Sequence, residues 1–187
     1  MKKGKDFILN LYSSKNTVFT IDEIALLLGN ASRDNLKARI NYYVKKGKLL
    51  NLRKGIYAKR EYNPLELAVR VYTPSYISLE TVLEKEGVIF QKYETIFIVS
   101  YLSRKIGIDG RRFQYRRIKE EIFINKEGVE LKNGYATATK ERAFLDALYL
   151  YKDYYFDNVD ILDKDIALKM VDIYHSKTLK EKIKGIL

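Results

Sequence analysis

The chain is constrained most by residues 17–60, where an apolar strand, two helices and a basic hairpin follow one another almost without connecting residues. Thr20 can cap the first helix, in which apolar residues recur at helical spacing until Gly29-Asn30. Ser32 can cap the second helix, which Gly47 ends. Two closely connected helices followed by a hairpin predict a winged helix-turn-helix.

The hairpin is expected from two apolar runs, at 49–52 and 56–58, joined by Arg53-Lys54-Gly55. Glycine supplies the backbone freedom that a tight turn needs. Because two cationic side chains flank this turn, the hairpin is typical of a wing that contacts phosphate.

The second helix is expected to bury one apolar face, made of Leu36, Ile40, Tyr43 and Val44, and to turn its other side chains outward. Amides can pair with adenine, a small side chain allows approach to a thymine methyl, and cations reach phosphates. The predicted DNA-binding residues are Ser32, Arg33, Asn35, Lys37, Ala38, Arg39, Asn41, Tyr42, Lys45, Lys46, Arg53 and Lys54. A protein-interaction module with a solvated basic face is the alternative.

The distribution of charge favours a polyanion as the partner of this segment. Residues 1–62 hold 14 Lys and Arg against 5 Asp and Glu, whereas residues 63–187 hold 21 against 19. A solubility requirement would spread the net charge of +11 along the chain. Double-stranded DNA is favoured over single-stranded RNA, because no aromatic and basic RNA-binding signature or Gly-rich clamp accompanies the charge.

Composition excludes several classes of site. The chain has no cysteine, which excludes disulfides and thiolate metal ligands and is typical of a reducing cytoplasm. Its single histidine, His175, excludes most triads and multi-histidine metal sites, so no cofactor is expected. No apolar run approaches about 18 residues and no signal-peptide core begins the chain, so a cytoplasmic protein without membrane contact is predicted.

The remaining residues predict a second domain, with domains at 1–62 and 63–187. Pro64 suits the first position of a helix, and Ser78 can cap the next one. Period-two patterns predict strands at 95–101, 113–118, 121–124 and 129–135, and helical patterns follow from Thr139, near 163–175 and at 177–185. The expected fold class is α+β: a winged helix-turn-helix, then a mixed α/β domain with a mainly antiparallel sheet flanked by helices.

A second basic surface is predicted between residues 104 and 119, where Phe113 and Tyr115 would face the core. It comprises Arg104, Lys105, Arg111, Arg112, Arg116 and Arg117. This surface could contact phosphates or an acidic partner, or it could be a solvated edge strand protected against aggregation. The sequence pattern does not distinguish between these two interpretations.

One set of residues supports an enzymatic alternative. Glu130-Leu131-Lys132 on a strand, with Asp109 upstream, has the spacing by which some nucleases place two carboxylates on Mg²⁺ and a lysine near the attacking water. A metal-dependent DNA nuclease with a winged-helix targeting domain is therefore the alternative function, although such triplets are common in chains rich in Lys and Glu.

Three segments together resemble the AbiEi antitoxins of bacterial abortive-infection toxin–antitoxin systems. They are Arg53-Lys54-Gly55-Ile56-Tyr57, Pro74 to Thr81 with Leu83 and Gly87-Val88-Ile89, and Ala138 to Asp146. The resemblance spans nearly the whole chain. It implies a non-enzymatic repressor whose winged helix binds inverted repeats in its own promoter, and a second domain that counters a nucleotidyltransferase toxin in antiviral defence.

Overall fold

The structure is a computed structural model that describes residues 3–29 and 33–187, with side chains placed for residues 7–29 and 34–187. The chain divides into two compact units, Met1–Val71 and Tyr72–Leu187. Helices and a mostly antiparallel set of strands give the expected α+β class. None of the helices within the described ranges is long and apolar enough to cross a membrane.

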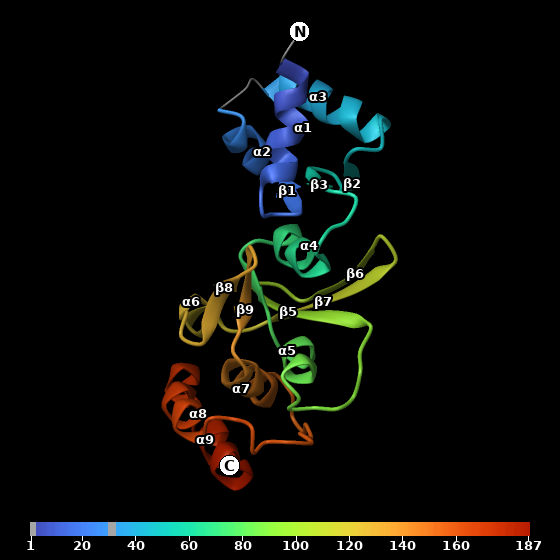
Figure 1. Cartoon of the computed structure of the whole chain (residues 1–187). Coiled ribbons are helices and arrows are strands. Elements are labelled where there is room, and N and C mark those ends of the chain that lie inside the picture. Colours follow the sequence, from blue (N-terminus) through green and yellow to red (C-terminus); the bar gives the residue numbers. More distant parts are fainter. Residues whose placement is uncertain (1–2, 30–32) are drawn as a thin grey trace. The chain divides into compact units, whose positions relative to one another are not determined.

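The first unit combines helices with a three-stranded antiparallel sheet of order β1-β3-β2 (Figure 1). Its elements are α1 (Lys3–Ser13), β1 (Val18–Thr20), α2 (Ile21–Leu27), α3 (Arg33–Lys45), β2 (Leu50–Arg53), β3 (Ile56–Ala58) and α4 (Pro64–Val71). An apolar cluster at its centre joins α1, α2, α3 and the sheet. The buried members are Phe7, Leu11, Phe19, Ile24, Leu36, Ile40, Leu49 and Tyr57.

Local sequence explains where α2 and α3 begin and end. The Thr20 hydroxyl accepts from the Glu23 N–H at 3.2 Å and the Glu23 carboxylate accepts from the Thr20 N–H at 2.7 Å, a reciprocal capping box that confirms the predicted cap. At the end of α3, Gly47 adopts a φ of +63° and the Lys48 N–H donates to the Tyr43 carbonyl at 2.9 Å. The predicted cap at Ser32 lies outside the described residues.

Helix α4 belongs to the first unit, so the division falls after Val71 and not at residue 62 as expected. The Glu66 carboxylate, although 2% exposed, accepts from the Thr17 and Val18 N–H groups at 2.7 and 2.9 Å. Arg70 bonds Glu23 at 3.2 Å. These contacts attach α4 to the start of β1 and to α2, which a boundary drawn at Pro64 from chain punctuation could not anticipate.

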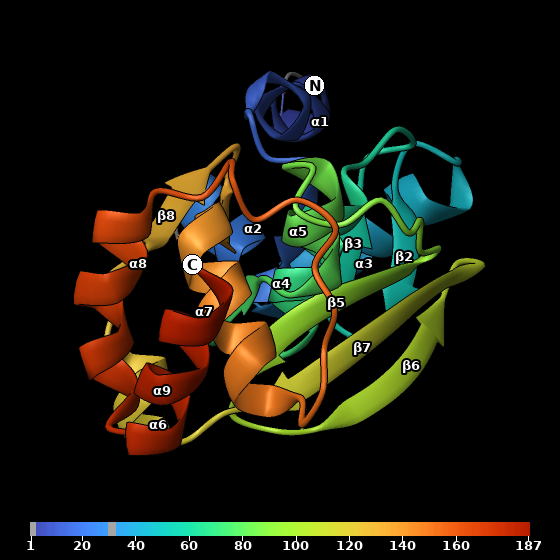
Figure 2. The same ribbon diagram turned by 90° about the horizontal axis from the view of Figure 1, so that it is seen from below.

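The second unit is built on a six-stranded mixed sheet of order β6-β7-β5-β4-β9-β8. Two neighbouring pairs, β4·β9 and β5·β7, are parallel, and the others are antiparallel. Helices α5 and α7 pack together and contact β5 and β9, and the carboxyl-terminal helices pack on α7 (Figures 1 and 2). The strands are β4 (Ser75–Ile77), β5 (Thr95–Ser100), β6 (Arg104–Ile108), β7 (Arg111–Arg117), β8 (Val129–Lys132) and β9 (Tyr135–Ala138).

The helices of this unit are α5 (Glu80–Lys85), α6 (Glu120–Ile124), α7 (Lys140–Leu150), α8 (Lys164–Met170), the 3₁₀ helix η1 (Val171–Tyr174) and α9 (Lys177–Ile186). Thr139 caps α7 as predicted, accepting from the Arg142 N–H at 3.2 Å. The strand expected at 121–124 is wrong, because Ile122 and Phe123 are buried one after the other and so do not alternate. The single strand expected at 129–135 is instead β8, the turn Asn133-Gly134 and the first residue of β9, which continues to Ala138. Strands β4 and β6 were not predicted.

Ser78 does not cap a helix, which corrects another expectation. Leu79 precedes α5 with a φ of +56°, and no side chain caps it. The Ser78 hydroxyl instead donates to the buried Asp146 carboxylate at 2.8 Å. A long-range partner inside the core thus replaces the local one.

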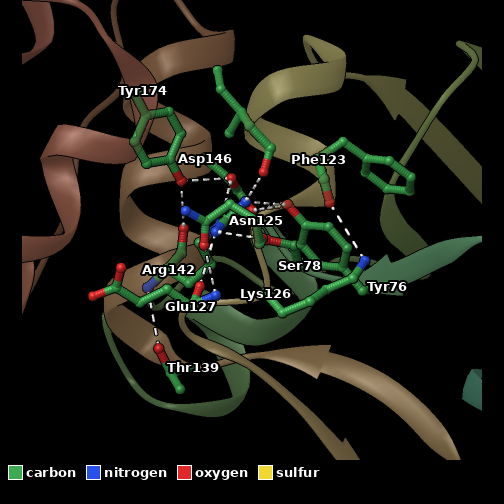
Figure 3. A network of polar contacts seen from close by, with 11 residues as sticks. Tyr76, Ser78, Phe123, Asn125, Lys126, Glu127, Thr139, Arg142, Asp146 and Tyr174 are labelled. Atoms are coloured by element: carbon green, nitrogen blue, oxygen red, sulfur yellow. Dashed lines mark hydrogen bonds and ion pairs between the residues drawn. The ribbon is translucent and has the colours of Figure 1, made fainter.

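A buried ionic network links α7 to Tyr76 of β4 (Figure 3). Arg142 and Asp146, both 0% exposed, form an i,i+4 pair on α7 with Nε and Oδ1 3.3 Å apart. Asp146 also accepts from the hydroxyls of Tyr76 and Tyr174 at 3.0 and 2.7 Å. Burial raises the pKa of both tyrosines well above the ordinary value, so they remain hydrogen-bond donors.

Candidate nucleic-acid interface

Helix α3 has one buried and one exposed face. Leu36 and Ile40 are fully buried, and Tyr43 and Val44 are partly buried against the same cluster, as the pattern predicted. The opposite side chains face outward; among the predicted site residues they are Asn35, Lys37, Ala38, Asn41, Tyr42, Lys45 and Lys46. Ser32 lies outside the described residues; Arg33 begins α3, but its side chain is not among those placed.

Arg39 differs from the other cations of α3 because it is half-buried. Its guanidinium carbon lies 4.6 Å from the centre of the Phe7 ring, which stacks on Tyr43 at 5.1 Å. Arg39 therefore helps to hold α3 against α1 through a cation–π contact. Tyr42, 55% exposed, lies edge-on to Tyr43 and leaves one ring face toward Lys46, whose Nζ is 5.9 Å away.

The β2–β3 hairpin carries exposed Arg53 and Lys54 at its turn, as predicted. Gly55 has a φ of +80°, a conformation that an L side chain rarely adopts. Its carbonyl accepts from the Ile21 N–H at 3.0 Å, which fixes the turn against the start of α2. The pairing of β2 with β3 shifts register between Asn51 and Arg53, which adds local twist to the hairpin.

Lys59 shows that not every cation of the first unit is available to a partner. Its Nζ donates to the carbonyls of Tyr12 and Ser14 at 3.2 and 2.7 Å, at the end of α1. Burial lowers the pKa of this lysine, although nearby Glu66 opposes the shift. The Tyr12 hydroxyl donates to the Lys48 carbonyl at 2.6 Å. These bonds hold both ends of the hairpin on α1.

The second predicted basic surface lies on β6 and β7. Phe113 and Tyr115 are 1% exposed, so the predicted inward face of β7 is confirmed. Arg112 bonds Glu94 at 2.6 Å, and half-buried Arg116 lies 5.0 Å above the ring of Tyr151. Arg104, Lys105, Arg111, Arg112 and Arg117 are exposed. Arg104 Nη1 donates to the Tyr72 hydroxyl at 3.3 Å. At least three of the six cations therefore have partners within the second unit, and β6 is an outer strand of the sheet.

The residues of the nuclease alternative do not come together. Asp109 lies in the turn between β6 and β7, with a φ of +51°, and Glu130 lies on β8. Because β6 and β8 are the two opposite outer strands of the sheet, the two carboxylates cannot share one metal ion. Glu130 instead pairs with Lys132 at 2.5 Å. Within the described ranges, no group of three or more metal-ligating side chains is found.

Sequence reasoning missed the Arg142–Asp146 network. Two residues four positions apart on a helix can pair, and this spacing was the available signal. Their complete burial was not predictable, because charged residues on a helix usually mark its exposed face.

The comparisons with protein families and with curated proteins assign no family to the chain. No family model matches the chain, and no curated protein matches it.

Proposed function

We propose that this protein is a DNA-binding transcriptional repressor whose first unit is a winged helix-turn-helix, with α3 as recognition helix and the β2–β3 hairpin as wing. The observation that carries the proposal is the exposed face of α3. It places Asn35, Ala38, Asn41 and Tyr42 along one side of a helix whose other side is buried. Amide and small side chains in this arrangement suit the edges of bases in a major groove.

Charge supports the same partner. The first unit holds 15 Lys and Arg against 6 Asp and Glu, and the second holds 20 against 18. Exposed cations lie at both ends of the proposed surface, with Lys45 and Lys46 at the end of α3 and Arg53 and Lys54 at the hairpin turn. Cations that flank a base-reading helix position it on the DNA backbone.

The resemblance to AbiEi antitoxins extends the proposal to a cytoplasmic antitoxin that binds inverted repeats in its own promoter and counters a nucleotidyltransferase toxin. Two of the resembling segments meet in the buried network. Tyr76 and Ser78 come from one, and Arg142 and Asp146 from the other. The residues that carry the resemblance are thus residues that stabilise the second unit, which supports a shared fold.

The DNA-binding proposal is tested first at the wing. Replacing Arg53 and Lys54 together by Ala should weaken binding to every duplex, and should reduce the slope of log affinity against log salt by roughly one to two units. The matched control replaces Lys169 and Lys184, exposed on α8 and α9, and should leave the slope unchanged. If both double variants alter the slope equally, the wing has no special role.

Base reading is tested at Asn41, using a preferred duplex selected from a random pool. Asn41→Ala should cost about 1–3 kcal/mol of preference at one base position while binding to random duplex stays nearly intact. Equal losses on selected and random DNA would assign Asn41 to the backbone.

The antitoxin role has an independent test. A gene adjacent to this one should encode a nucleotidyltransferase whose expression stops growth, and co-expression of this chain should restore growth. Restoration by a chain with the wing double substitution would show that neutralisation does not require DNA binding.

A further inference from the structure

The outer edge of β8 presents a backbone available for pairing. In the described part of the chain, β8 is an outer strand whose one neighbour is β9 (Figure 1). The two strands turn through Asn133 and Gly134, with φ values of +50° and +81°, as in a two-residue type I′ turn. Such a turn makes Lys132 and Tyr135 a hydrogen-bonded pair, and every second pair after it is hydrogen-bonded as well.

The alternation identifies which groups point outward. The Thr139 N–H donates to the Gly128 carbonyl at 2.8 Å, which agrees with hydrogen-bonded pairs at even-numbered positions of β8. Val129 and Leu131 therefore direct their N–H and C=O groups away from β9. The Val129 N–H is occupied by the Lys126 carbonyl at 2.9 Å. Leu131 is left at the centre of the edge with both backbone groups directed outward.

The side chains of β8 add self-complementary charge. Leu131 is 79% exposed, and Glu130 and Lys132 are exposed on the opposite face of the strand. Charged side chains on an edge strand normally discourage pairing. Here, however, an acid and a base lie on either side of one leucine. An antiparallel copy of the strand centred on that leucine places each acid opposite a base.

We propose that β8 pairs with β8 of a second copy of this chain, antiparallel and about a two-fold axis at Leu131. Each Leu131 then donates to and accepts from the same residue of the second copy, as in a hydrogen-bonded antiparallel pair. Glu130 faces Lys132 of the second copy, twice, in the closer non-hydrogen-bonded positions. Centring the axis on Glu130 or Lys132 would set like charges opposite each other, so the sequence selects one register.

The association is weak in free solution and does not depend on DNA binding. Two four-residue edges bury less than the roughly 1,000 Å² of a stable interface. We therefore expect a dissociation constant on the order of 0.1 mM. The pairing joins the two six-stranded sheets into one continuous sheet.

Sedimentation equilibrium of the full chain, from low micromolar to about 0.5 mM, tests the pairing. Glu130→Lys and Lys132→Glu each set like charges opposite in both cross-strand positions, so each variant should associate at least ten-fold more weakly than the unmodified chain. An equimolar mixture of the two variants restores opposite charges in both positions and should associate again. The double substitution E130K/K132E should also restore self-association.

Matched controls distinguish the effect of the facing charge pairs from the effect of a change in net charge. Glu181→Lys and Lys169→Glu make the same charge changes on exposed positions of α9 and α8, and should leave association unchanged. The melting temperature of each variant verifies that it folds. The proposal is overturned if the unmodified chain stays monomeric at 0.5 mM, if the single variants associate as tightly as it does, or if the mixture fails to associate.

Discussion

The two units build their interiors differently. The central cluster of the first unit is made of apolar and aromatic side chains, and its buried carboxylate, Glu66, lies beside the backbone of β1. The second unit buries four charged residues, Glu80, Glu141, Arg142 and Asp146. The difference follows from which buried polar groups need hydrogen-bond partners in each interior.

In the second unit, carbonyl groups of α6 and of the irregular connection between α6 and β8 reach the interior and need donors. Arg142 supplies them: Nη1 donates to the carbonyls of Asn125 and Glu127 at 3.3 and 2.8 Å, and Nη2 to that of Ile122 at 2.9 Å (Figure 3). Nε and Nη2 also reach Asp146 and Tyr76. All five donor positions of the guanidinium are used. Among the described residues, no buried side-chain nitrogen or oxygen lacks a partner.

The largest effect is expected where the interiors differ most. Arg142→Met should destabilise the second unit by about 3–5 kcal/mol, because it leaves Asp146 buried without its cation and three carbonyls without donors. Hydrogen exchange measured across the chain should show faster exchange in the second unit and unchanged protection in the first. Arg117→Met, on an exposed side chain of β7, is the control and should cost less than about 0.5 kcal/mol. A small loss in Arg142→Met would show that the network is not needed for stability.

The corresponding change in the first unit removes apolar contacts alone. Leu36→Ala should cost about 2–4 kcal/mol, because it creates a cavity in the cluster while alanine preserves helix propensity. Its effect on hydrogen exchange should be confined to the first unit. Leu26→Ala, at a side chain 72% exposed on α2, should be nearly neutral. Loss of protection in both units would mean that the two units unfold together, which would contradict separate stabilisation by their two interiors.

Helix caps should contribute similar free energies of unfolding in both units. The difference in stabilisation between the units would then lie in their interiors. Thr20→Ala and Thr139→Ala should each cost about 1 kcal/mol in denaturant unfolding, because each hydroxyl accepts from one first-turn N–H. A cost for Thr139→Ala as large as that for Arg142→Met would instead place Thr139 in the network.

The smallest effect concerns pH. Burial raises the pKa of Glu80 above its ordinary value, although the Tyr151 hydroxyl, which donates to both carboxylate oxygens at 2.9 and 3.0 Å, opposes this. A raised folded-state pKa contributes stability that is complete below the unfolded pKa, about 4.5, and is lost as pH rises through the folded value. The free energy of unfolding of the unmodified chain, relative to that of Glu80→Gln, should therefore fall from pH 4 to pH 8. A difference that does not change with pH would contradict the assigned shift.

Much of the architecture was predictable because it is local. Caps at Thr20 and Thr139, the stop at Gly47 and the hairpin turn at Gly55 each depend on a few neighbouring residues, and all were predicted. The outward face of α3 followed in the same way, since helical spacing assigns its two faces once Leu36 and Ile40 are taken as buried. The residues proposed to contact DNA therefore come from the sequence.

Tertiary structure alone decided the features that depend on partners distant in sequence. Ser78, with cap chemistry, bonds Asp146, 68 positions away, and α4 joins the first unit through Glu66 and the backbone of β1. The order of strands in the sheet separates Asp109 from Glu130 and places β8 at an edge. A buried charge is stable only where several donors and acceptors converge on it. That convergence is set by the packing of whole elements, so the residues on either side of Arg142 in the sequence could not reveal it.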